Sequence, residues 1–477
     1  MENNQHKRVA EIFPFKINRP LASEEKSAFE IVGKLQKQGF ESYIAGGAVR
    51  DLYLDRVIHD IDIATAAKPE EVKKIFPTSY GRGKAFGVVA VRPKKELEFE
   101  VATFRIDLGS ADHRRPAQVR FTTAENDARR RDFTINGLFF DPTKSQIIDF
   151  VGGVKDLNNR LIRFVGVAEN RIDEDYLRML RAIRFTHRLD FALDFEAAKA
   201  IKKQAKNIIQ ISLERIRDEL TLIITGNKRE NALMQLESLG LLRIILPEVQ
   251  ALRDVFQPPE FHSEGDVWIH TLLAIETLEN PSAELAWTVL LHDVGKPATA
   301  GRRDVPGKTK IIFFEHEQKS VEIAKKILER LRFSNDFIND ISWAISQHMR
   351  IINAFRGMSE RKQKKLFTDP NINLLLDLTK ADLKASLRPG GKIDLGLYNL
   401  ALAKKEEFEK ETADDEKQQI KKFSLITGND IMKILKIPAG PEIGKIKSQI
   451  ETAFLDSEIS TRKKALEMIK KIKLFKG

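Results

Sequence analysis

Two aspartates separated by one residue, Asp60 and Asp62, have a spacing that suggests chemistry. The run from Asp60 to Thr65 predicts a short strand. Because side chains alternate across a strand, both carboxylates project from one face, while Ile61 and Ile63 point into a core. Neighbouring carboxylates repel each other unless a cation lies between them, and divalent metals usually fill that place. The pair therefore favours a metal site.

A Gly46-Gly47 pair lies upstream, between a predicted strand at 42–45 and a helix start at 48–51. Glycines let backbone N–H groups approach an anion closely at a helix N-terminus. Taken separately, a Gly-Gly pair is usually only a turn, and two aspartates at this spacing are common on exposed strands. Their combination within about twenty residues favours a phosphate site beside a metal site. That pairing suggests chemistry on a nucleoside triphosphate.

A strictly alternating segment, 96–104, carries Glu96, Glu98 and Glu100 on one face of a predicted strand. By default such glutamates are solvated charges at a sheet edge. A two-metal polymerase site, however, needs a third carboxylate from a strand beside the aspartate pair. The segment is therefore the candidate source of that carboxylate.

Asp175 and Arg178 lie three residues apart in a segment predicted to be helical, and we expect both on one helix face. Such a pair is usually an ordinary surface salt bridge. Alternatively, Asp accepts and Arg donates hydrogen bonds, which matches the amino group and ring nitrogen that cytosine and adenine share. Uracil and guanine would leave polar groups unpaired, and sites reject bases strongly in this way.

The residues around Asp60 resemble the signature of a known family. The run from Gly46 to Asp51, followed by Asp60-Ile-Asp62, is similar to that of class II tRNA nucleotidyltransferases and bacterial poly(A) polymerases, in the polymerase-beta nucleotidyltransferase superfamily. Residues 129–136, Arg-Arg-Arg-Asp-Phe-Thr-Ile-Asn, resemble a second motif of that family, and the segment from Asp173 to Arg178 resembles its base-recognition motif. A following helix with Glu214 and Arg215 is expected to brace the nucleotide-binding helix.

The resemblance implies a set of site residues. Asp60, Asp62 and Glu100, with Glu98 as the fallback, would be catalytic and would hold two Mg²⁺ ions. The arginines would contact phosphates, and Asp132 and Asn136 would hold ribose or neighbouring backbone. The expected nucleotide-binding residues are Gly46, Gly47, Arg50, Arg105, Arg129, Arg130, Arg131, Asp132, Asn136, Asp175 and Arg178.

A separate series of histidines and aspartates begins near residue 255. A single helical histidine is usually a core or surface residue, but here an adjacent His-Asp pair follows an apolar helix. The order resembles that of HD-domain metal-dependent phosphohydrolases, and neutral imidazoles with carboxylates suit several divalent ions. The resemblance implies a first-metal set of His270, His292, Asp293 and Asp382, extended towards a second metal by His316 and His348. The ion would be a divalent transition metal or Mg²⁺.

The leading interpretation is a tRNA nucleotidyltransferase that adds C and A residues (CCA) to the tRNA 3′ end from CTP and ATP. Poly(A) polymerase and enzymes restricted to CC or A addition remain alternatives, and residues 106–128, expected to be a mobile basic loop, are where restricted enzymes would differ. From another class, the chain could be an HD phosphohydrolase whose head only binds RNA. A non-catalytic RNA-binding protein is disfavoured, because every carboxylate that the chemistry requires is present.

Composition and length are compatible with this interpretation. The chain has 477 residues and a formal net charge of +11, and this charge favours a polyanionic partner such as RNA. It contains no cysteine, which excludes disulfides and thiolate metal sites. No segment has the length and apolar character of a signal or transmembrane sequence, so we expect a cytoplasmic protein without a membrane partner. The oligomeric state stays open.

The expected fold class is α+β, with a small mixed sheet in an N-terminal head followed by an all-α body. We expect four domains: a catalytic head at 22–150, a helical neck with base-recognition motifs at 151–250, an HD metal-binding domain at 255–400, and a basic helical tail at 401–477 that contacts tRNA.

Overall fold

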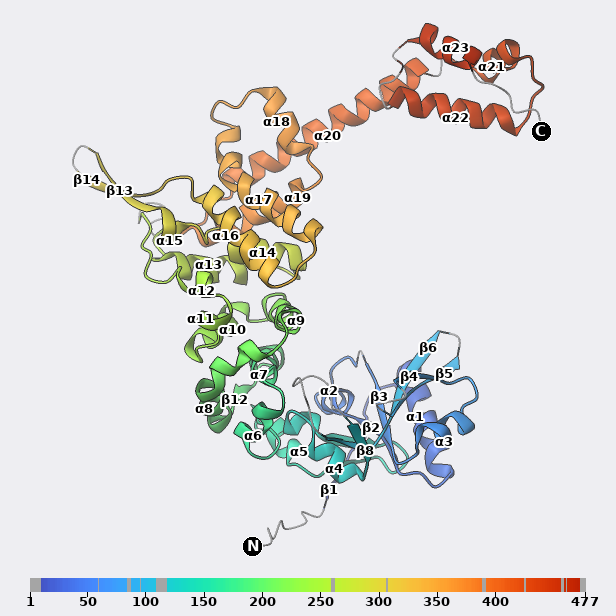
Figure 1. The fold of residues 1–477 in the computed structure, drawn as a ribbon, viewed down its shortest axis with the longest axis vertical. Coiled ribbons are helices and arrows are strands. Elements are labelled where there is room, and N and C mark those ends of the chain that lie inside the picture. The colour runs from blue at the N-terminus through green and yellow to red at the C-terminus, as the bar shows by residue number, and fades with distance from the viewer. Residues whose placement is uncertain are drawn as a thin grey trace. The chain divides into compact units, whose positions relative to one another are not determined.

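The structure is a computed structural model that describes residues 10–58, 60–83, 87–94, 96–108, 118–258, 262–305, 308–387, 392–423, 426–455, 459 and 461–471. The chain forms two compact units (Figure 1). The first comprises Met1–Arg350 with Asp377–Leu395, and the second comprises Ile351–Leu376 with Gly396–Gly477. A mixed sheet precedes a long series of helices, so the expected α+β class is confirmed.

The head is built on a mixed sheet that has eight strands among the described residues, in the order β1-β10-β9-β2-β3-β6-β5-β4. Its neighbouring strands are antiparallel except for β3 and β6, which are parallel. The strands are β1 (Glu11–Pro14), β2 (Ser42–Ala45), β3 (Asp62–Thr65), β4 (Tyr80–Gly83), β5 (Val88–Lys94), β6 (Leu97–Thr103), β9 (Leu138–Asp141) and β10 (Gln146–Asp149).

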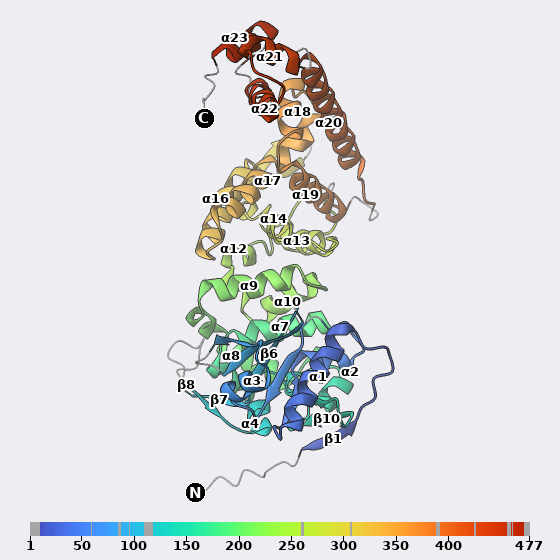
Figure 2. The ribbon, with the colours of Figure 1, turned by 90° about the vertical axis from the view of Figure 1, so that its right-hand side faces the viewer.

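The two faces of this sheet have different partners. Helices α1 (Ser23–Lys37) and α3 (Pro69–Ile75) lie side by side over one face, where Leu35, Ile63 and Val101 are fully buried (Figures 1 and 2). On the other face, Ala64 and Phe139 pack in a second cluster with residues of α4 (Ala124–Arg129). Alternation along β3 therefore directs Ile63 to the main core and Asp62 to the α4 face.

The segment at 106–128 was expected to be a loop, and this prediction was wrong for its described ends. Strands β7 (Arg105–Leu108) and β8 (Gln118–Phe121) form a two-stranded antiparallel sheet, and α4 follows. The basic run at 112–116 lies outside the described residues. The sequence did not predict these strands because their composition is polar. A two-stranded sheet needs few buried side chains, so it leaves little apolar pattern in the sequence.

The sheet is followed by helices that pack through their apolar stripes. Helix α7 buries Met179, Leu180 and Ile183 at helical spacing and packs on α9 and α10. The elements of this region are α5 (Gly153–Asn158), β11 (Leu161–Ile162), α6 (Ala168–Glu174), α7 (Arg178–Leu189), β12 (Ala192–Leu193), α8 (Phe195–Gln204), α9 (Leu213–Ile224), α10 (Arg229–Ser238), α11 (Leu242–Ile245) and α12 (Pro247–Gln250), with 3₁₀ turns at Thr134–Asn136 and Ala205–Gln210.

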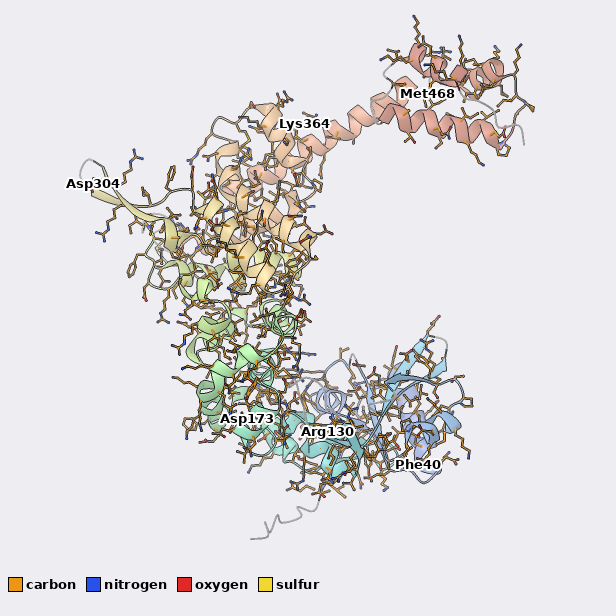
Figure 3. The ribbon with its side chains drawn as sticks, viewed as in Figure 1. Phe40, Arg130, Asp173, Asp304, Lys364 and Met468 are labelled. Carbon is orange, nitrogen blue, oxygen red and sulfur yellow. The ribbon has the colours of Figure 1, made fainter. Side chains whose placement is uncertain are left out.

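The next helices continue the same core. Helices α13 and α14 are apolar on nearly all sides, as buried helices are, and α14 packs against α9. The elements are α13 (Val267–Glu276), α14 (Ala283–Leu291), α15 (Lys296–Thr299), the hairpin β13 (Ala300–Val305) and β14 (Lys308–Phe313), α16 (His316–Arg330), α17 (Asn335–Ala354) and α19 (Ile372–Ala385). Figure 3 labels Asp304 on the hairpin.

The second unit contains α18 (Glu360–Phe367), α20 (Gly396–Phe423), α21 (Gly428–Leu435), α22 (Pro441–Leu455) and α23 (Arg462–Lys471). Its last three helices share a small core of their own that includes Ile431, Ile450 and Ile469. Pro441 opens α22, as expected for proline in a first turn. Because 351–376 groups with the tail, the division into four domains stays a prediction. Among the described residues, no helix is both long and apolar enough to cross a bilayer.

Candidate active site and metal centre

Three carboxylates meet where β3 and β6 run side by side. The parallel register pairs Ile63 with Val101, so Asp62, one residue earlier, lies beside Glu100 on the same face. Asp60 lies just before β3 rather than within it, because the strand begins at Asp62. Burial raises the pKa of Asp62, the negative charge of Asp60 raises it further, Arg131 opposes the shift, and Glu100 adds to it.

This mutual repulsion is what a bound cation relieves. Oxygen donors at close quarters are the set that hard divalent ions such as Mg²⁺ prefer, so the three residues fit a metal of this kind. Glu98, the fallback, lies two residues along β6, and its carboxylate accepts a hydrogen bond from the Arg92 Nε at 2.7 Å. Of the β6 glutamates, Glu100 is the one whose charge raises the pKa of Asp62.

Gly46 makes room for an arginine beside these acids. Its φ is +70°, in the left-handed region, and a Cβ placed on it would lie 2.5 Å from Nη1 of Arg131. The same Nη1 donates to the Asn136 carbonyl at 3.2 Å, and Nη2 donates to Asp127 at 3.2 Å. Gly47 opens α2 (Gly47–Tyr53), and a Cβ on it would lie 3.4 Å from Nη2 of Arg50.

Arg50 was expected to contact phosphate, but in this structure its guanidinium is buried and engaged by the protein. It donates to both oxygens of Asp51 at 2.9 and 2.8 Å and to Oδ1 of Asn136 at 2.7 Å. The Asn136 amide in turn donates to Asp132 at 3.0 Å. Arg50 and Asn136 therefore form a network that holds the turn after Gly46.

Asp132 links this network to α7, since Arg181 donates to its Oδ2 at 3.0 and 2.6 Å. Burial alone would raise the pKa of Asp132, but the charge of Arg181 and the hydrogen bond from Asn136 lower it to about 2. The carboxylate is therefore ionised at neutral pH and occupied by protein donors. Its contacts therefore tie the segment that follows α4 to α7.

The other head arginines lie on or beside α4, and their side chains are more exposed than that of Arg50. Arg129 pairs with Glu125 at 2.9 Å, and Arg130 pairs with Asp127 at 2.8 Å. The Asp127 carboxylate also accepts a hydrogen bond from the backbone N–H of Arg105 at 3.2 Å. Figure 3 labels Arg130, whose carbonyl oxygen lies 3.4 Å from Nη2 of Arg178.

Asp175 and Arg178 do not share a helix, so that part of the prediction was wrong. Helix α6 ends at Glu174, Asp175 has an extended backbone, and α7 begins at Arg178. The Asp175 carboxylate accepts a hydrogen bond from the Leu177 N–H at 3.1 Å, and this local contact competes with helical hydrogen bonding.

The two side chains also have separate partners. Arg215 of α9 donates to both oxygens of Asp175 at 3.1 and 2.7 Å, a contact that is compatible with the bracing role expected for Arg215. Arg178 donates to Glu174 at 2.7 Å and to the Arg171 carbonyl at 2.7 Å. The structure thus brings both residues to the junction of α6 and α7 without pairing them with each other.

The predicted histidine cluster assembles in the helical part of the first unit. Asp293 lies at its centre, with Nε2 of His292 at 3.1 Å from Oδ2 and Nε2 of His316 at 3.4 Å from Oδ1. Nε2 of His316 and His348 are 3.2 Å apart, and Nε2 of His270 lies 3.1 Å from Asp382. Asp293 and the four histidines are at most 5% exposed, whereas the Asp382 side chain is 26% exposed.

These spacings fit metal ligands. Ligand atoms about 2.1 Å from one ion lie about 3.0–3.4 Å from each other. Nε2 of His270 and Nε2 of His292 are buried without a well-directed hydrogen bond, which ligation would supply. Burial is the main cause that lowers the pKa of His348, to about 4, so its imidazole is neutral and able to ligate. The chemistry of this donor set suits several divalent ions.

Comparison with known proteins matches three regions of the chain to known families. Residues 42–163 match the family "Poly A polymerase head domain", residues 190–252 match "Probable RNA and SrmB-binding site of polymerase A", and residues 262–385 match "HD domain". The CCA-adding enzyme of Streptococcus pneumoniae strain CGSP14 is 30% identical over 453 residues, covering 94% of this chain and 97% of that enzyme. The chain belongs to the CCA-adding enzyme family.

Two further members of the CCA-adding enzyme family are similar to the chain. The enzyme of Lactobacillus helveticus is 47% identical over 200 residues, an alignment that spans 42% of this chain and about half, 50%, of that relative. The solved structure of the Bacillus stearothermophilus CCA-adding enzyme in complex with CTP has a TM-score of 0.60 and 26% identity, covering 94% of this chain and 97% of that chain. The family members are nucleotidyltransferases, and their fold implies the use of a divalent metal.

Two residues that contact the predicted site residues were not predicted from the sequence. Asp127 organises Arg105, Arg130 and Arg131, and its i, i+3 and i, i+4 spacing to two of them was the available signal. Lys296 lies 2.7 Å from Oδ2 of Asp293, and its position three residues after that aspartate was the comparable signal.

Proposed function

We propose that this chain adds C and A nucleotides to the 3′ end of tRNA from CTP and ATP, releasing pyrophosphate. The observation that carries the proposal is the meeting of Asp60, Asp62 and Glu100 at the β3–β6 pair in a chain that matches a CCA-adding enzyme along nearly its whole length. Such an enzyme needs three acids for metal-assisted transfer, a cationic site for triphosphate and a means of selecting bases.

The proposed metal in the head is Mg²⁺, held by Asp60, Asp62 and Glu100. When bound, Mg²⁺ in such sites supplies activation of the RNA 3′-hydroxyl and neutralises charge on the departing pyrophosphate. Arg131, kept beside the acids by Gly46, would contact the triphosphate together with Arg129 and Arg130. Arg50 and Asn136 would hold the glycine turn in place rather than touch phosphate.

Asp175 and Arg178 are proposed to select the base. Their side chains lie at the α6–α7 junction, and each is held by one charged partner, Arg215 or Glu174. We propose that the hydrogen bonds to the Watson–Crick edge form from this braced position. A base with the opposite donor and acceptor order would leave these groups unpaired, which costs about 1–3 kcal/mol per group.

The test is incubation with tRNA that lacks its 3′ end, labelled CTP or ATP, and Mg²⁺, with the product length as the readout. Addition limited to C, C and A is expected. A long A ladder would favour poly(A) polymerase, and addition that stops after CC, or that needs CC already present, would favour the restricted enzymes. The variant Asp62→Asn keeps the shape of the side chain and should abolish addition, whereas persistent addition would overturn the assignment of the acids.

For the histidine cluster we propose a bound divalent ion, either a transition metal or Mg²⁺. The observation that favours it is the set of buried Nε2 atoms around Asp293. Phosphohydrolase activity at this cluster is a second candidate function, tested by phosphoester hydrolysis in the Asp62→Asn variant. The cytoplasmic location expected from the sequence stays a prediction.

A further inference from the structure

The four histidines of the cluster are oriented in two different ways. In His292, His316 and His348, Nδ1 contacts the carbonyl oxygen three residues earlier, at 2.8, 3.2 and 2.6 Å. Each carbonyl accepts the Nδ1 proton, so the neutral ring is left with its Nε2 lone pair free to ligate. His270 lacks such a carbonyl contact among the described residues, and its Nδ1 lies 3.0 Å from Oε1 of Glu264.

The Glu264 side chain is buried and held in place for this contact by further hydrogen bonds. Its side chain is 1% exposed, and its Oε1 also accepts from Nδ1 of His262 at 2.7 Å. Its other oxygen, Oε2, accepts from the Leu387 N–H at 3.0 Å, and Ser263 donates to the Leu387 carbonyl at 2.8 Å. Leu387 follows the helix that carries Asp382. Glu264 therefore joins the segment before His270 to the segment after Asp382.

We propose that Glu264 is a positioning residue that fixes His270 as the strongest imidazole donor of the cluster. This inference rests on the proposed metal binding at the cluster. A carboxylate that accepts the Nδ1 proton fixes the tautomer and ring orientation and raises the basicity of Nε2 more than a neutral carbonyl does. His270 and Asp382 would then form the side of the site that binds the ion most firmly.

An alternative for these residues is a separate metal site. His262, Glu264 and His270 place one ligand atom each within 4.8 Å of one another. The hydrogen-bond geometry disfavours it, because Oε1 of Glu264 lies at hydrogen-bond distance from Nδ1 of both rings and a protonated Nδ1 cannot ligate a metal. If Glu264 only orients His270, removing His262 should leave the metal affinity unchanged. If the three residues form a separate metal site, removing His262 should weaken metal binding.

The experiment titrates Co²⁺ into protein stripped of metal with a chelator, with Mg²⁺ present to occupy oxygen-ligand sites, and reads the visible absorption and the binding heat. Glu264→Gln is expected to weaken Co²⁺ binding about 10- to 100-fold, as loss of a residue that orients a ligand does, and to shift the absorption bands. Unchanged affinity in folded Glu264→Gln protein would overturn the proposal.

Glu317→Gln is the matched control. The Glu317 carboxylate lies 3.8 Å from Nδ1 of His316, but that ring is oriented by the Phe313 carbonyl, so Co²⁺ affinity should not change. His262→Asn should keep the affinity, because it leaves Glu264 to His270 alone. A loss of Co²⁺ binding in His262→Asn would mean that His262 is itself a ligand and would overturn the proposal.

A measurement on the unaltered chain covers the case in which Glu264→Gln does not fold. In protein loaded with Zn²⁺ and labelled with ¹⁵N-histidine, the Nδ1 proton of His270 should resonate furthest downfield of the four, because a carboxylate accepts it. A His270 proton indistinguishable from the three on carbonyls would contradict the inference. Absence of metal binding to the unaltered chain would overturn both this inference and the metal site, while nucleotide addition, measured separately, would still test the head.

Discussion

At the residue scale, Gly46 leaves the space in which the Arg131 guanidinium lies beside Asp60, Asp62 and Glu100. Replacing Gly46 with Ala puts a Cβ against Nη1 of Arg131 at a φ of +70° that alanine rarely adopts. We expect about a 100-fold loss of nucleotide addition, because displacing a positioning group by about 1 Å has effects of that size. Steady-state addition of CMP to tRNA measures the loss.

Gly39→Ala is the control for the backbone part of this effect. Gly39 has a φ of +86°, and a Cβ on it would meet nothing within 4 Å. Its variant should lose some stability and keep its addition rate. Equal losses of activity in the two variants would show that strain, and not the displaced guanidinium, is responsible.

Asp132 gives the head a pH-dependent link to α7. Its Asn variant should lose about 2 kcal/mol of stability at neutral pH, since hydrogen bonds to a charged group are removed. The pKa of Asp132 is lowered to about 2, so this contribution is present above the ordinary carboxyl pKa of 3.8 and disappears as the pH falls through 2. Urea unfolding of both proteins at several pH values measures the difference, which should shrink only below about pH 4. A difference that is constant down to pH 2 would contradict the ionised link.

At the element scale, the break between α6 and α7 determines where Asp175 and Arg178, the proposed base-selecting residues, lie. Arg215→Gln removes the bidentate partner of Asp175 without touching the acids on β3 and β6. We expect the preference for CTP over UTP to fall about tenfold, since a misplaced acceptor no longer rejects the wrong base. The ratio of kcat/KM values for the two nucleotides is the measurement.

Arg184→Gln tests whether the effect is specific. Arg184 also joins α7 to α9, but it does so by donating to Glu219 at 2.7 Å rather than to Asp175. Its variant should reduce stability and leave the nucleotide preference unchanged. If both variants lose selectivity alike, the packing of α7 on α9 matters rather than the position of Asp175.

Sequence patterns predicted the strands better than the helix break. Alternation in 60–65 and 96–104 predicted which side chains share a face within each strand, because the side-chain period of a strand is fixed. The choice of Glu100 as the partner of Asp62 came from the family resemblance, and the register of β3 and β6 sets these two residues side by side. Spacing alone failed at Asp175, since a local hydrogen bond from Leu177 overrode the helical pattern.

Long-range contacts were the other part that the sequence could not supply. The order of His and Asp residues predicted that these residues cluster, but nothing in the sequence indicated that Glu264 would accept a hydrogen bond from the Leu387 N–H, 123 residues later. Likewise, an arginine beside a glycine turn suggests a phosphate ligand, and the sequence did not indicate that Arg50 would be buried and donate to Asn136, 86 residues later. Contacts between residues far apart in sequence leave no periodic signal.

At the scale of the whole molecule, the tail is expected to serve tRNA rather than chemistry. Its last three helices have a core of their own and carry exposed lysines, Lys445, Lys463, Lys464, Lys470 and Lys471. A chain shortened after residue 423 should keep its rate at saturating tRNA but show a higher KM. The slope of log Kd against log salt should become shallower by about 0.9 for each phosphate that the shortened chain no longer neutralises. An unchanged KM and salt slope would exclude binding of tRNA by the tail.

Strand β1 pairs with β10, joining Glu11 to Asp149 at the edge of the head sheet. A growing chain therefore cannot complete this sheet until synthesis has passed residue 149. Until then, β1 has no β10 to pair with. Contacts so distant along the chain slow folding, because loop-closure entropy is lost before they form. The proposed catalytic acids Asp60, Asp62 and Glu100 are synthesised before residue 149, so a nascent chain contains them before the head sheet is complete.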